Sequence, residues 1–86
     1  MLYNYTVEKP RIFTEEGQVI FLKIRDRINE FIKTSGAFRA DKVLSNITGT
    51  SFQHRACLDR MIELGEIVCL SSDEIWGQYK VYTKEV

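Results

Sequence analysis

The chain has 86 residues, 44% of them hydrophobic and 28% charged, which is ordinary for one small globular domain. Its 12 basic and 12 acidic residues give a net charge of zero. This balance counts against strong non-specific DNA binding, because phosphate neutralisation supplies much of that affinity. Residues 1–55 nevertheless carry 9 basic and 6 acidic residues, whereas residues 56–86 carry 3 and 6.

The two cysteines and the one histidine bear on the cellular compartment and on metal binding. No Cys/His spacing fits a zinc site, since His54 is the only histidine. Met1–Arg11 lacks the pattern of a signal sequence, and the aliphatic-aromatic run Val19–Leu22 is far shorter than the ~20 residues of a membrane span. We therefore expect a cytoplasmic protein without metal, cofactor or membrane contact, in which Cys57 and Cys69 are free thiols.

Residues 1–13 form a predicted N-terminal arm. Tyr3–Val7 alternates like a strand for five residues. The arm could pair with a sheet edge, pack on the first helix or reach a second subunit, and the sequence leaves all three open.

The first helix is predicted from Thr14 to about Thr34. Thr14 precedes two acidic residues and is a favourable N-cap, while Gly36 suits the left-handed cap that ends a helix. A short strand is expected at 37–39. The apolar face of the helix repeats at spacings of three and four through Ile20, Phe21, Ile24, Ile28, Phe31 and Ile32.

Two further helices and a hairpin follow. The helices are predicted at about 40–46 and 51–64, separated by the turn Thr48–Thr50, and the second ends at Gly65. Strands at 66–70 and 75–83 flank Ser71–Glu74 as a hairpin. The expected core contains Phe21, Ile24, Ile28, Phe31, Leu44, Leu58, Met61 and Ile67.

This order of helix, tight turn, helix, glycine and strand resembles the winged helix-turn-helix superfamily. The resemblance spans residues 14–83, followed by a tail at 84–86. It implies an α+β fold, a three-helix bundle with a small C-terminal β-hairpin in the order helix–strand–helix–helix–strand–strand. It also implies a DNA-binding transcriptional regulator that reads the major groove with its third helix.

The third helix has two faces when its residues are spaced at 100°. Leu58, Met61, Ile62, His54 and Gly65 fall on the buried side, so His54 is expected to be a packed core residue. The opposite side carries Phe52, Gln53, Ala56, Asp59, Arg60 and Glu63, with Arg55 at its edge.

Binding is favoured over catalysis, because no nucleophile has a partner base and no glycine-rich phosphate loop occurs. Groove-inserted helices read bases with polar residues of their N-terminal half. The candidates for base contacts are Thr50, Ser51, Gln53 and Arg55. The candidates for phosphate contacts are Arg39, Lys42 and Arg60.

Other residues favour a protein partner instead of double-stranded DNA. Apolar side chains on the outer helix face, the negative charges of Asp59 and Glu63, and an acidic hairpin tip would all oppose a duplex. A homodimer through the arm and the first helix is a further possibility. The apolar anchors of the alternative, a protein-interaction module, would be Phe52, Ala56, Trp76 and Tyr82.

Overall fold

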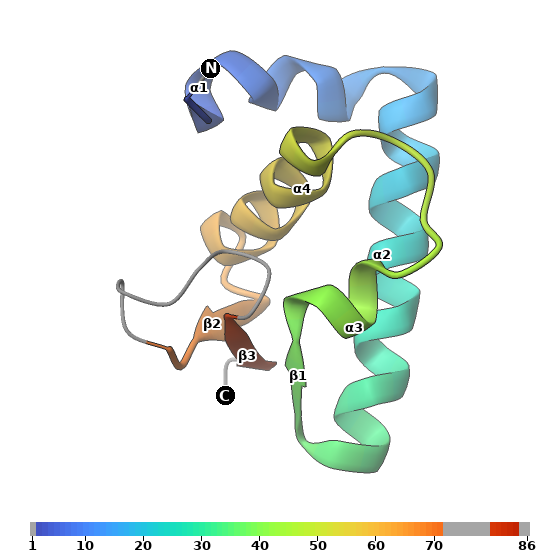
Figure 1. Cartoon of the computed structure of the whole chain (residues 1–86), viewed down its shortest axis with the longest axis vertical. Helices are drawn as coiled ribbons and strands as arrows, with labels where there is room; N and C mark the ends of the chain where they lie inside the picture. Colours follow the sequence, from blue (N-terminus) through green and yellow to red (C-terminus); the bar gives the residue numbers. More distant parts are fainter. Residues whose placement is uncertain (1, 72–79, 85–86) are drawn as a thin grey trace.

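The computed structural model describes residues 2–71 and 80–84 (Figure 1). These residues form an α+β fold with four α-helices, one 3-10 helix and a three-stranded antiparallel sheet. No helix among them is long and apolar enough to cross a bilayer. The elements in chain order are α1 (Tyr5–Glu8), η1 (Lys9–Phe13), α2 (Glu15–Ser35), β1 (Ala37–Arg39), α3 (Ala40–Leu44), α4 (Ser51–Glu63), β2 (Ile67–Cys69) and β3 (Val81–Lys84).

The long helix α2 begins and ends at its predicted caps. The hydroxyl of Thr14 accepts a hydrogen bond of 3.0 Å from the backbone N–H of Gly17. At the other end Gly36 adopts a left-handed conformation, with φ of 75°, and its N–H donates to the carbonyl of Ile32. Because the left-handed cap reverses the chain, β1 starts directly after α2 and runs back along it.

The sheet has the order β1-β3-β2, so β3 lies in the middle. Phe38 of β1 pairs with Tyr82 of β3, and their rings stack with centroids 5.5 Å apart. On the other edge Val68 pairs with Thr83. The predicted hairpin is thus confirmed by the pairing of 67–69 with 82–84, one residue beyond the predicted end at 83, while residues 72–79 of its predicted tip and second strand lie outside the described residues.

The core forms where α2, α4 and the sheet meet. Six of the eight predicted core residues are buried, and Phe31 and Leu44 pack against them half-buried. Leu58 is 2% exposed and His54 9%, as expected for the inner side of α4. Further buried positions come from every part of the fold: Ile12, Ile20, Phe38, Ala40, Val43, Ile47, Ala56, Cys57 and Tyr82.

The strand-like expectation for Tyr3–Val7 is wrong, because Tyr5–Glu8 form helix α1 and Asn4 is its N-cap. The side chain of Asn4 caps α1 by accepting a hydrogen bond of 2.9 Å from the N–H of Thr6. Helices α1 and η1 then cross α4, as the blue ribbon in Figure 1 shows. The expected packing of the arm on the first predicted helix is confirmed for η1, which contacts α2, and the arm in addition lies across the third predicted helix. Residues 2–13 are called the N-terminal segment below.

A close approach of η1 to α2 fixes the direction of the N-terminal segment. A Cβ atom at Gly17 would lie 2.0 Å from the carbonyl oxygen of Arg11, so only glycine fits here. Beside it, Nε2 of Gln18 donates a hydrogen bond of 2.7 Å to the carbonyl of Ile12. The close backbone approach at Gly17 and the hydrogen bond of the Gln18 side chain together fix the corner between η1 and α2.

Candidate nucleic-acid interface

Helix α4 is covered on two sides. Its inner side packs into the core, and the N-terminal segment covers the opposite face, which carries Phe52, Asp59 and Glu63. Ala56 on that face is fully buried, so its assignment as an exposed apolar anchor is wrong. Phe52 is half-buried and meets the ring of Tyr3 edge-on, with centroids 5.6 Å apart. The side of α4 that faces α3 stays open.

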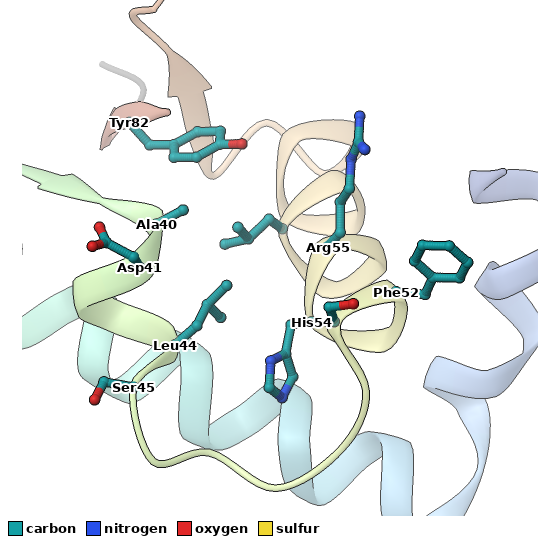
Figure 2. Close-up of a pocket in the computed structure, with 10 residues that line it drawn as sticks. Ala40, Asp41, Leu44, Ser45, Phe52, His54, Arg55 and Tyr82 are labelled. Carbon is teal, nitrogen blue, oxygen red and sulfur yellow. The ribbon is translucent and has the colours of Figure 1, made fainter. Parts of the chain in front are cut away.

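A pocket of about 440 Å³ occupies this open side, between α3, α4 and β3 (Figure 2). Its volume lies within the ~300–1,000 Å³ usual for ligand pockets. Arg27 of α2 supports the wall by donating hydrogen bonds to the carbonyls of Val43, at 3.0 Å, and of Ser45. The described residues lining the pocket are Ala40, Asp41, Leu44, Ser45, Ser51, Phe52, His54, Arg55, Leu58 and Tyr82.

Tyr82 contributes a hydroxyl to a partly apolar surface. Its side chain is 5% exposed, and its hydroxyl points across the pocket toward α4 (Figure 2). Burial raises the pKa of Tyr82 to about 12, so the hydroxyl keeps its proton and can donate it to an acceptor. The expectation that Tyr82 is an exposed anchor for a protein is wrong, because its ring is stacked on Phe38.

Arg55 stands at the rim of the same pocket. Its side chain is exposed and extends away from the axis of α4 (Figure 2). The guanidinium lies 4.3 Å from the centroid of the Tyr3 ring, a cation–π contact with the N-terminal segment. Ser51, one helical turn earlier, lines the pocket beside it. Of the four predicted base-reading residues, these two lie together.

The other two are engaged in the turn before α4. The hydroxyl of Thr50 caps the helix by accepting a hydrogen bond of 3.1 Å from the N–H of Gln53. Gln53 is half-buried and lies over the turn, since a Cβ atom at Gly49 would be 2.7 Å from its Oε1. Nε2 of His54 lies 2.7 Å from the carbonyl oxygen of Thr48 and holds the same turn. The side chains of Thr50, Gln53 and His54 therefore hold the conformation of the turn that precedes α4.

The three predicted phosphate contacts have different surroundings. Arg39 forms an ion pair with Asp41, with N–O distances of 2.5 and 2.8 Å. Lys42 is exposed on α3 and has no ion pair with a described residue. Arg60 pairs with Glu63 at 2.6 Å and lies over the ring of Phe13 on the side of α4 away from the pocket.

The two carboxylates on the outer face of α4 are paired within the protein. Asp59 accepts a hydrogen bond of 2.5 Å from the hydroxyl of Tyr3. Glu63 accepts from Lys9 at 3.2 Å, and hydrogen bonds from Lys9 and Arg60 lower its pKa to about 2. Sequence reasoning missed the role of the two N-terminal residues here, because an aromatic residue in an arm carries no signal for a carboxylate 56 positions later.

Comparison of the chain with known protein families, with characterised proteins and with solved structures gives no match. Within the described ranges, no group of three or more His, Cys, Asp or Glu side chains could hold a metal ion.

Proposed function

We propose that the chain is a winged helix-turn-helix module that binds double-stranded DNA, of the kind used in transcription regulation. The observation that carries the proposal is Arg55. Its side chain is exposed at the rim of the pocket that Ser51 also lines, and its guanidinium lies over the ring of Tyr3 at the border of the N-terminal segment. Arginine is the commonest base-reading residue, through the two acceptors of guanine.

The arrangement of the elements supports this proposal. Helices α3 and α4 follow each other and are joined by residues 45–50, and β2 follows α4 after Gly65. The order β1-β3-β2 puts β1, which precedes α3, in one sheet with the C-terminal strands. This order supports the proposal of a winged helix-turn-helix, in which the second helix of the motif commonly enters the major groove.

The proposed contact uses an edge of α4 and not its whole outer face. The N-terminal segment lies over Phe52, Asp59 and Glu63, so a duplex would approach from the side of α3 and the pocket. The same segment lessens the electrostatic objection to DNA, because it supplies partners for Asp59 and Glu63. Like charges facing a phosphate backbone would otherwise weaken binding.

Phosphate contacts would flank Arg55. Lys42 on α3 has no ion pair among the described residues, and the hydroxyl of Tyr82 can donate a hydrogen bond from the far wall of the pocket. Hydroxyl, lysine and arginine side chains are common donors to phosphate oxygens. Thr50 and Gln53 act in this proposal by holding the turn, and they make no base contact.

A fluorescence anisotropy titration with mixed genomic fragments at low salt tests the proposal. We expect binding, and we expect Arg55→Gln to weaken it by ~1–3 kcal/mol at a preferred site. Lys42→Gln should weaken binding to all DNA sequences alike and make the affinity depend less steeply on salt concentration. Lys23→Gln is the matched control, because Lys23 is an exposed lysine of α2.

Melting temperatures of Lys42→Gln and Lys23→Gln should match the parent, and that of Arg55→Gln should fall by a few degrees at most, because its contact with Tyr3 is worth about 0.5–1 kcal/mol. Absence of binding at tens of micromolar protein would overturn the proposal, since even non-specific phosphate binding is visible there. Equal losses for Arg55→Gln and Lys23→Gln would also overturn it, because they would show attraction by overall charge only.

A further inference from the structure

The corner between η1 and α2, at the upper right of Figure 1, exposes apolar side chains. Phe13 is 56% exposed, Leu22 50% and Leu64 46%. These three residues line one hollow of about 200 Å³, together with the buried Ile12 and with the side chains of Arg25 and Arg60. Grouped apolar side chains on a surface mark interaction sites more often than scattered ones do.

Phe13 stands between two hollows. It also lines a wider, shallow depression of about 530 Å³ with Tyr5 and Pro10 of the N-terminal segment and Glu63 of α4. The ring of Phe13 keeps an exposed side although the guanidinium of Arg60 lies 5.4 Å from its centroid, and an exposed ring beside hollows of this size can fit a copy of itself. In a two-fold contact the same surface patch is used by both partners. The inserted side chain and the hollow that receives it must therefore lie on one surface of the chain.

Opposite charges flank Phe13 along the chain. Arg11 precedes it, with a side chain that is 63% exposed and only loosely paired with Glu8, at 3.4 Å. Glu15 and Glu16 follow it, exposed in the first turn of α2 and without ion pairs to the described residues. A two-fold axis near Phe13 would place the basic side of one copy against the acidic side of the other.

We propose that this corner is the contact surface of a homodimer. Each copy inserts Phe13 between the rings and leucines of its partner, and each Arg11 faces Glu15 and Glu16 across the axis. The occupant is a second copy of this chain, because the pattern of Arg11 with Glu15 and Glu16 complements itself across a two-fold axis. The inference does not depend on the proposed DNA contact, which lies on the other side of α4.

Sedimentation equilibrium of the full chain over a wide range of concentrations tests the proposal. We expect a reversible monomer–dimer equilibrium that Phe13→Ser weakens by more than about tenfold, as truncation of a central aromatic anchor does. Leu22→Ser should weaken it in the same direction. Leu70→Ser is the matched control, because Leu70 is 59% exposed after β2 and should leave the equilibrium unchanged.

A charge exchange makes the test specific. Arg11→Glu alone, and Glu15→Arg with Glu16→Arg alone, should each weaken self-association. Mixing the two variants should restore dimers that contain one chain of each kind, which native mass spectrometry distinguishes. Circular dichroism melting shows whether each variant is folded.

Three results would overturn the proposal. These are a chain that stays monomeric at the highest concentration, a dimer that Phe13→Ser leaves intact, and mixed variants that do not pair. None of them bears on DNA binding. Conversely, Arg55→Gln should leave the dimer unchanged, so failure of one proposal is distinguishable from failure of the other.

Discussion

The hydroxyl of Tyr3 donates a hydrogen bond of 2.5 Å to Oδ2 of Asp59, across 56 positions of the chain. The same ring stands edge-on to Phe52 and lies under the guanidinium of Arg55. One side chain of the N-terminal segment therefore covers an aromatic residue, pairs a carboxylate and positions an arginine of α4. Burial and the hydrogen bond to Asp59 both raise the pKa of Tyr3, so the bond persists at alkaline pH.

Removing the Tyr3 hydroxyl should measure how firmly the N-terminal segment is held. We expect Tyr3→Phe to lower the free energy of unfolding by about 1–2 kcal/mol, because the bond has a charged acceptor and is partly buried. Tyr5→Phe should cost less, since its hydrogen bond of 3.1 Å to Glu63 is exposed. Urea unfolding in a double-mutant cycle with Asp59→Asn checks the assignment. Additive effects of the two changes would contradict it.

Acid should loosen the N-terminal segment. The unfolded chain binds a proton at Glu63 near pH 4.5, whereas Lys9 and Arg60 lower the pKa in the folded protein to about 2. The contribution of this carboxylate to the stability of the folded protein is therefore complete above pH 4.5 and is lost as the pH falls toward 2.

Glu63→Gln should remove that part of the pH dependence. Melting curves recorded across the same interval compare the variant with the parent. An unchanged slope in the variant would mean that other carboxylates cause the loss.

Two glycine substitutions should differ in their effects on stability. Gly17→Ala places a Cβ atom 2.0 Å from the carbonyl oxygen of Arg11, so η1 must move away from α2. We expect a loss of about 2–4 kcal/mol, as for other severe steric conflicts with backbone. Gly36→Ala meets no atom within 4 Å and has only its φ of 75° to accommodate, which should cost about 1 kcal/mol. Thermal unfolding measures both, and equal losses would argue against the close approach at Gly17.

The two thiols should react at different rates. Cys57 is fully buried, and burial raises its pKa to about 11, whereas Cys69 is half-buried near the carbonyl of Ser71. Thiolate is the reactive form. Alkylation of the native protein near neutral pH should therefore modify Cys69 first and Cys57 only on unfolding, as mass spectrometry of the peptides would show. Rapid labelling of Cys57 in a Cys69→Ser variant would contradict this order.

Sequence patterns predicted the parts of the fold that depend on local chemistry. Thr14 and Gly36 cap α2 because a hydroxyl and a left-handed glycine satisfy helix ends wherever they occur. The apolar spacing of α2 and α4 likewise gave most of the core, since helical periodicity alone fixes which residues share a face.

Contacts distant in the chain were not predictable in this way. Alternation at Tyr3–Val7 indicates a strand, but α1 begins at Tyr5, and Tyr3 before it and Tyr5 within it both donate hydrogen bonds to carboxylates of α4. A helical projection places Ala56 on an exposed face, because it shows only which side of the helix is opposite the core. Its burial depends on the N-terminal segment, which no spacing within α4 reveals.

Among the described residues, both strand pairings of the sheet include β3. β1 and β2 do not pair with each other, although both precede β3 in the chain. During synthesis, the sheet therefore cannot begin to form until residues 81–84 have left the ribosome, and until then two strand edges stay unpaired. A stop codon before Val81 would remove the strand that both edges share, leaving helices α2 and α4 without one wall of their core.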